Sequence, residues 1–155
     1  MKRILIVDDN PVLVKGLTNV LVEAGYEVLT AEDGAAAVSI ARRERPDLML
    51  LDITFPPDVA HGGGVAWDGF LIMTWIRRME ECQGIPIVII SGSDATQYRP
   101  RALKAGAVAY FQKPFEPTEL VATIRQTLGD SEPAANEQKE AEPQSPPPSQ
   151  PLRMA

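Results

Sequence analysis

Short apolar runs alternate along the first four-fifths of the chain with stretches in which apolar residues recur at helical spacing. The runs have the length and the β-branched composition of buried strands, so they predict five β-strands. The predicted strands cover residues 3–7, 27–31, 48–53, 86–90 and 107–111. Five helices are predicted between and after them.

The first helix has clear boundary signals. Asn10 is a suitable N-cap, Pro11 suits the first helical position, and Gly25 follows the last apolar residue of the stretch. A second helix is predicted over residues 34–44, where Pro46 stops it.

The three later helices follow from spacing alone. One opens at Asp68 and is expected to bury Trp75, together with four further apolar residues: Leu71, Ile72, Ile76 and Met79. A short helix is expected near residues 99–105, and the last begins at Pro117. Strands that alternate strictly with helices predict a parallel sheet covered on both faces, a doubly wound α/β fold.

Composition changes after residue 128. The segment 129–155 holds six of the 14 prolines and only Leu152 and Met154 as large apolar residues. It cannot bury enough apolar surface to offset its conformational entropy, so we expect a disordered Pro/Glu/Gln-rich tail. Residues 1–128 then form the one domain, and 27 further residues are too few for a fused output domain.

Charge and cysteine content narrow the class of protein. A net charge of -6 disfavours nonspecific binding to nucleic acid or to anionic membranes. No apolar run has the length of a membrane span, and the single cysteine, Cys82, cannot form an internal disulfide. These features predict a cytoplasmic protein in which Cys82 is a packing residue.

Candidate chemistry lies where the predicted strands end. Asp8 and Asp9 follow the first strand, Asp52 and Ser91 lie at the ends of the third and fourth, and Lys113 follows the fifth. Ligands of open parallel sheets bind beyond these carboxyl ends, so the five side chains are expected to meet. Carboxylates brought so close favour a Mg²⁺ ion, and with Lys113 nearby Asp52 becomes a nucleophile for a phosphoryl group.

Four stretches carry a resemblance to a known family. They are IVDDNP at 6–11, LMLLDIT at 48–54, PIVIISGS at 86–93 and AYFQKPF at 109–115. In sequence and order they resemble the blocks of two-component response-regulator receiver domains. The resemblance covers about residues 2–128 and implies a flavodoxin-like sheet of strand order 2-1-3-4-5.

The resemblance also implies roles at the metal site. Asp52 matches the phosphoacceptor, and Asp8 and Asp9 match the acidic pair that organises Mg²⁺, Asp9 more directly. Thr54 matches the position whose backbone carbonyl completes the metal shell.

Switch residues are implied in the same way. Ser91 matches the hydroxyl residue that moves toward the phosphoryl group, and Lys113 matches the family's lysine. Pro114 matches a proline often preceded by a cis bond. Tyr110 matches the aromatic residue that swings inward on activation, with an ordinary half-buried strand aromatic as the alternative.

The implied function is a phosphoacceptor module of a two-component or phosphorelay system, not a turnover enzyme. Its expected donor is a histidine kinase or a histidine phosphotransfer protein, and its output passes through contacts with a downstream protein. Homodimerisation is left open. The alternatives are a receiver-fold scaffold that is never phosphorylated and a phosphohydrolase of the haloacid-dehalogenase type.

The sequence departs from the family pattern in one place. Asp68, which opens the third helix, lies 16 residues beyond Asp52, because the segment 57–67 lengthens the connection. The segment is interpreted as a lid or partner-specificity surface, or as a silent insertion. Its histidine, His61, is the only one in the chain and is interpreted as a solvated loop residue.

Overall fold

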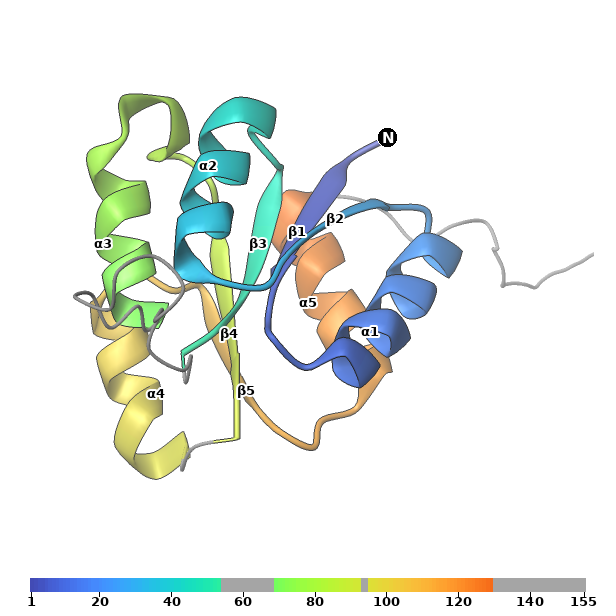
Figure 1. Ribbon diagram of the computed structural model, residues 1–155. Coiled ribbons are helices and arrows are strands. Elements are labelled where there is room, and N and C mark those ends of the chain that lie inside the picture. Colours follow the sequence, from blue (N-terminus) through green and yellow to red (C-terminus); the bar gives the residue numbers. More distant parts are fainter. Residues whose placement is uncertain (54–68, 93–94, 130–155) are drawn as a thin grey trace, which may run out of the picture. The chain divides into compact units, whose positions relative to one another are not determined.

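The structure is a computed structural model that describes residues 1–53, 69–92 and 95–129. Strands and helices alternate along the chain, as the sequence predicts (Figure 1). The strands are β1 (Arg3–Val7), β2 (Glu27–Ala31), β3 (Leu48–Asp52), β4 (Ile87–Ser91) and β5 (Ala109–Gln112). The helices are α1 (Pro11–Glu23), α2 (Gly34–Glu44), α3 (Gly69–Arg78), the 3-10 helix η2 (Glu80–Cys82), α4 (Ala95–Lys104) and α5 (Pro117–Leu128).

The five strands form one parallel sheet in the order β2-β1-β3-β4-β5. This confirms the doubly wound α/β fold and the order that the family resemblance implies. The chain divides into two compact units, residues 1–124 and 125–155, and the sheet lies wholly in the first. In the second unit, the structure describes the end of α5 and Gly129.

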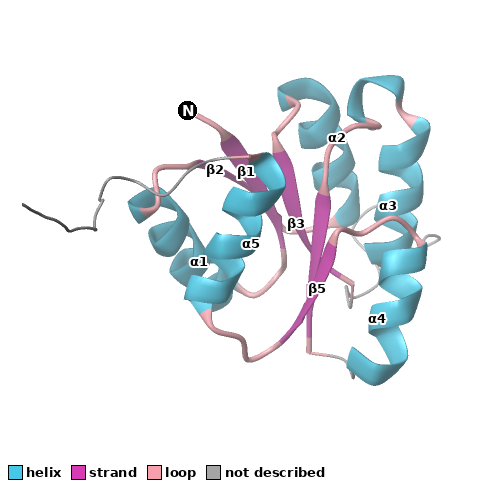
Figure 2. Ribbon diagram, turned by 180° about the vertical axis from the view of Figure 1, so that it is seen from behind, coloured by secondary structure: helices cyan, strands magenta, loops and turns pink. Residues whose placement is uncertain are grey.

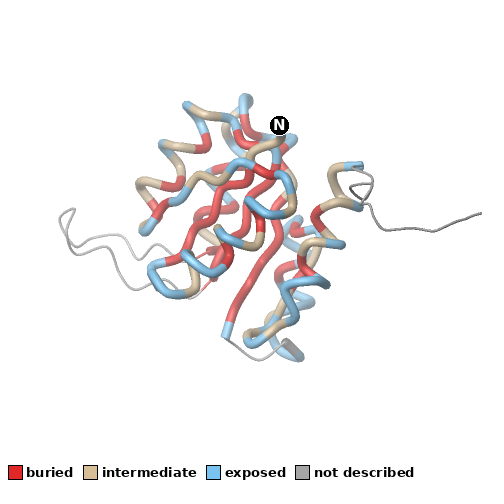
Figure 3. The backbone as a smooth tube through the Cα atoms, turned by 90° about the vertical axis from the view of Figure 1, so that its right-hand side faces the viewer, coloured by how far each residue is buried: buried red, intermediate tan, exposed pale blue. Residues whose placement is uncertain are grey.

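Helices cover both faces of the sheet within residues 1–124. Helix α1 and the first part of α5 lie on one face, and α2, α3 and α4 lie on the other (Figures 1 and 2). The centre of the sheet is buried between them: β3 and β4 are buried at every residue, whereas the edge strands β2 and β5 are partly exposed (Figure 3). Strands that are apolar on both faces are expected of such a sheet, and they explain the continuous apolar runs.

The capping residues of the first helix act as predicted. The Asn10 side chain accepts hydrogen bonds from the backbone amides of Val12 and Leu13, at 3.0 and 3.2 Å. Gly25 follows the helix with a φ of 98°, a left-handed conformation that glycine adopts without a steric penalty.

Cys82 is buried, and its thiol contacts the Ala41 carbonyl at 3.4 Å, which confirms its role in packing.

Two predictions about the helices were wrong. Helix α4 begins at Ala95, not near residue 99, and Pro100 lies inside it. Helix α4 has so few apolar residues that their spacing does not reveal its first turn. Trp75 is 43% exposed, although the spacing placed it on the buried face of α3. Ile72 and Ile76 face the core fully buried, and Trp75 lies at the edge of their face.

The predicted strand boundaries differ from the observed ones by at most two residues. The largest difference is in β5, which spans Ala109–Gln112 where the sequence predicts 107–111. In the part of the chain that the structure describes, no helix has both the length and the apolar character needed to cross a membrane.

Candidate functional site

The carboxyl ends of the strands bring the predicted site residues to one edge of the sheet. Asp52 is the last residue of β3 and Ser91 the last of β4, while Asp8 directly follows β1. Lys113 directly follows β5, and its backbone amide donates a 2.7 Å hydrogen bond to the Ser91 carbonyl. The juxtaposition that the sequence predicts is therefore present for these four residues.

Three carboxylates form a cluster at this edge. Asp8, Asp9 and Asp52 each offer a carboxylate oxygen, and these oxygens lie within 4.8 Å of one another. Asp8 and Asp52 are only 1% and 4% exposed, whereas Asp9 is exposed to solvent. The cluster thus combines two buried acids with one that faces water, through which an ion could enter.

Lys113 supplies the positive charge next to the cluster. Its Nζ donates to Asp8 Oδ2 at 3.0 Å and to Asp52 Oδ2 at 3.4 Å. One ammonium group cannot balance three carboxylates, so the cluster keeps an excess of negative charge. Oxygen ligands with an excess of negative charge fit a hard divalent cation such as Mg²⁺.

The pKa values of two groups reflect this environment. Burial raises the pKa of the Asp8 carboxyl above its ordinary value, although hydrogen bonds from Asn10 and Lys113 oppose the shift. Burial alone would lower the pKa of the Lys113 ammonium, but its hydrogen bond to Asp8 and the charges of Asp52 and Asp8 raise it overall. Lys113 therefore stays charged, while the charge on Asp8 is held at an energetic cost that a cation would reduce.

Asn10 has a role at the site that its sequence signal did not reveal. Its backbone amide donates to Asp8 Oδ1 at 2.9 Å, while the Asp8 amide donates to the Ala31 carbonyl at 3.1 Å. Both carboxylate oxygens of Asp8 therefore accept a hydrogen bond: Oδ1 from the backbone amide of Asn10, which caps α1, and Oδ2 from the ammonium group of Lys113. The N-cap signal identified Asn10 only as a helix boundary.

Gly69 supports the strand end that carries Asp52. The Gly69 amide donates to the Ile53 carbonyl at 3.1 Å. A Cβ atom at this position would lie 2.5 Å from the Ile53 Cα and 2.9 Å from the Asp52 carbonyl oxygen. Only glycine allows α3 to begin so close to the end of β3. In the sequence, the only sign of this close approach is that a glycine follows Asp68. Spacing alone does not show what packs against that glycine.

Both predicted switch residues are buried. Ser91 is fully buried, and Tyr110 in β5 is 7% exposed. The peptide bond between Lys113 and Pro114 is cis. Three of the predicted features, namely Thr54, the segment 57–67 and its His61, lie outside the residues that the structure describes.

Comparisons with known proteins agree with this geometry. The family model described as "Response regulator receiver domain" matches residues 4–125. The chain is 34% identical over 128 residues to the protein PilH of Pseudomonas aeruginosa, covering 83% of this chain and 98% of that protein. It is also 36% identical over 135 residues to the DNA-binding response regulator MtrA of Mycolicibacterium smegmatis, of which it spans about half, 54%.

Solved structures show the same fold. The receiver domain of a sensor histidine kinase from Pseudomonas aeruginosa superposes with a TM-score of 0.71 at 31% identity, covering 83% of this chain and 98% of that one. That crystal structure has a magnesium ion coordinated in its active-site cleft. A putative response regulator from Chloroflexus aurantiacus gives the same TM-score, identity and coverage.

Proposed function

Because the chain belongs to the family of response regulator receiver domains, we propose that Asp52 accepts a phosphoryl group in a two-component or phosphorelay system. A receiver domain is a signalling module and not a turnover enzyme. The observation that carries the proposal is the position of Lys113 Nζ, 3.0 Å from Asp8 and 3.4 Å from Asp52, at the edge of a three-carboxylate cluster.

The proposed transfer uses the Asp52 carboxylate as the nucleophile. One of its oxygens attacks the phosphorus of a phosphohistidine donor, the P–N bond breaks as the new P–O bond forms, and the imidazole leaves as a proton is taken up. Lys113 neutralises negative charge on the transferring oxygens from its place beside Asp52. The hydroxyl of Ser91 donates a hydrogen bond to the product phosphoryl group.

The described residues fit a Mg²⁺ ion. Asp8, Asp9 and Asp52 would hold it through carboxylate oxygens, and the backbone carbonyl of Thr54 is a further proposed ligand. When bound, the ion would supply positive charge that offsets the charge of the transferring phosphoryl oxygens. The magnesium in the related Pseudomonas structure supports this assignment.

The signal would leave through protein contacts. A phosphoryl group on Asp52 adds negative charge and strong hydrogen-bond acceptors, which would draw the Ser91 hydroxyl inward and open space for Tyr110. Helix α4 packs on β5, so this change would reach the surface of both elements. The proposed donor is a histidine kinase or a histidine phosphotransfer protein, and the proposed receiver of the signal is a downstream protein.

We propose the domain division that the composition predicts, with a receiver domain over residues 1–128 and a disordered tail over 129–155, and a cytoplasmic location. The match of the family to residues 4–125 supports the first part. Limited proteolysis would test the division, since cleavage should be confined first to sites beyond residue 128.

Phosphorylation is tested by intact-protein mass spectrometry after incubation with acetyl phosphate and Mg²⁺. We expect a gain of one phosphoryl group that Asp52→Asn abolishes and that chelation of the metal prevents. Glu23→Gln, which removes an exposed carboxylate at the end of α1, is the matched control and should label normally. Asp9→Asn should label only at a higher Mg²⁺ concentration.

An unmodified chain, under conditions that label a control receiver, would favour the scaffold alternative. The haloacid-dehalogenase alternative is set aside by the family to which the chain belongs.

A further inference from the structure

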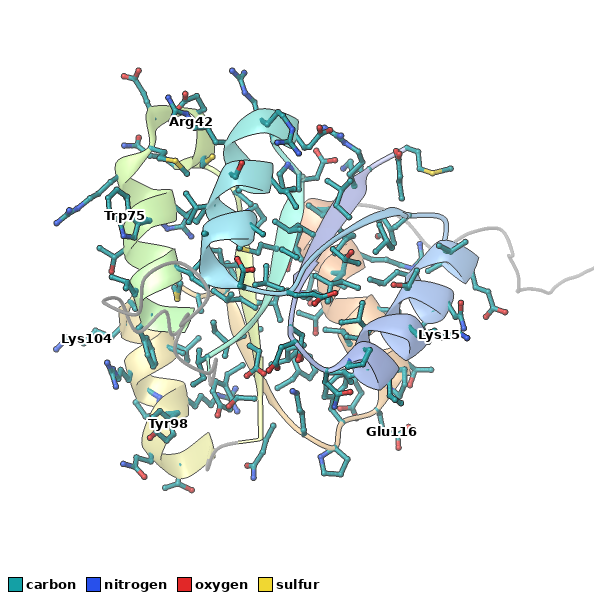
Figure 4. The ribbon with its side chains drawn as sticks, viewed as in Figure 1. Lys15, Arg42, Trp75, Tyr98, Lys104 and Glu116 are labelled. Atoms are coloured by element: carbon teal, nitrogen blue, oxygen red, sulfur yellow. The ribbon has the colours of Figure 1, made fainter. Side chains whose placement is uncertain are left out.

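Helices α2 and α3 border an open groove of about 600 Å³ on the surface of the domain. Its lining residues come from both helices and from η2: Ala35, Val38, Ser39, Arg42, Arg43, Trp75 and Glu81. Trp75 is 43% exposed, while the half-buried Ala35 and Val38 supply apolar surface nearby. Figure 4 labels Arg42 on α2 and Trp75 on the neighbouring α3. Tryptophan and arginine together are typical of the central residues of protein interfaces.

The charged part of the groove lies away from the phosphorylation site. Arg42 and Arg43 are in the last turn of α2, and Glu81 is in η2, which follows α3. In a parallel α/β sheet the helices end where the next strands begin, at the edge opposite the carboxyl ends that carry Asp52. The proposed phosphoryl transfer therefore does not use these charged residues.

The charges of the groove suit a second copy of this chain. The chain carries a net charge of -6, so two copies repel one another overall. The groove is an exception, since it holds two arginines and one glutamate. When a surface carries positive and negative charges around an apolar centre, two copies of it related by a two-fold axis can be complementary to one another.

The ion pair inside the groove is weakly held. Arg42 Nε lies 3.7 Å from Glu81 Oε2, and the two side chains are 68% and 36% exposed. Pairs of this kind contribute little stability, so their partners can be shared with a second molecule at small cost. A two-fold axis near this pair would bring two arginines and two glutamates together.

We propose that the α2–α3 groove is a two-fold interface between copies of this chain, with Trp75 packed at its centre. Arg42 of each copy pairs with Glu81 of the partner subunit. The proposed contact is confined to this one groove, so we expect a weak dimer that forms at high concentration. The proposal does not depend on phosphorylation of Asp52, and the dimer forms equally in the Asp52→Asn variant.

Sedimentation velocity of the full chain, from micromolar to millimolar concentration, is the test. The wild type should show a concentration-dependent shift from monomer to dimer, and Trp75→Ala should raise the dissociation constant by about tenfold or more. Val22→Ala, at an exposed apolar residue of α1, is the control and should dimerise like the wild type. Thermal unfolding followed by circular dichroism reports whether each variant is folded.

Charge reversal gives the sharper result. Arg42→Glu alone and Glu81→Arg alone should each be monomeric, because like charges then meet across the axis. A mixture of the two variants should form a heterodimer, because each of its two cross-axis contacts again joins one acidic and one basic side chain. A wild type that stays monomeric, dimerisation that survives all three substitutions, or a mixture that fails to associate would overturn the proposal.

Discussion

Lys113 is expected to be the residue on which the stability of the metal-free site depends most. Its Nζ contacts Asp8 and Asp52, whose side chains are 0% and 6% exposed, so water screens these carboxylates poorly. Removing one partner of a buried ion pair costs about 3–5 kcal/mol, because a charge is left uncompensated. The lysine itself is 25% exposed, which places the expected cost of Lys113→Met at the lower end, about 3 kcal/mol.

Urea unfolding in the presence of a chelator measures this cost. For an unfolding slope of about 2 kcal/mol per molar urea, the midpoint of the Lys113→Met variant should fall by about 1.5 M. Lys104→Met removes an exposed lysine at the end of α4 and is the matched control, with an expected change within about 0.5 kcal/mol.

Magnesium should distinguish the electrostatic explanation from a simple packing loss. A bound cation neutralises the same carboxylates, so Mg²⁺ should stabilise Lys113→Met more than it stabilises the wild type. Adding Asp8→Asn to Lys113→Met should restore part of the lost stability in the absence of metal, because one of the uncompensated charges is removed. Equal losses for Lys113→Met and Lys104→Met, or an identical Mg²⁺ effect in variant and wild type, would refute the reasoning.

Three further predictions concern the residues around the cluster. Gly69→Ala should destabilise the fold by about 1–3 kcal/mol in thermal unfolding, because its Cβ would lie 2.5 Å from the Ile53 Cα; Gly16→Ala, with nothing within 4 Å, should not. Asn10→Ala should cost about 1 kcal/mol through loss of the α1 cap, measured by urea unfolding. The pKa of the Asp8 carboxyl is raised in the folded protein, so the folded protein binds the proton of this carboxyl more tightly than the unfolded chain does. The stability that this proton contributes is fully present below the ordinary pKa of 3.8, and it is lost as the pH rises through the pKa of the folded state. Metal-free Asp8→Asn should therefore gain stability relative to the wild type from acidic to neutral pH; a constant difference would contradict this.

Local patterns in the sequence were enough to predict a parallel α/β sheet and the edge that carries the site. The alternation of apolar runs and helical spacing gave the order of strands and helices, and the rule for parallel sheets placed Asp8, Asp52, Ser91 and Lys113 at one edge. These inferences succeed because the spacing of apolar residues, and the residues that follow a strand, are set by neighbours in the sequence. The family resemblance added the strand order, which spacing alone does not specify.

Other features depended on contacts between distant parts of the chain. Lys113 pairs with Asp8, 105 residues away, and with Asp52, whereas Asp9 stays exposed. Spacing could not decide which acid of the adjacent pair would be buried, nor that Trp75 would line the groove between α2 and α3. The physical reason is that burial and charge pairing are set by what packs against a residue, and only the tertiary structure brings those neighbours together.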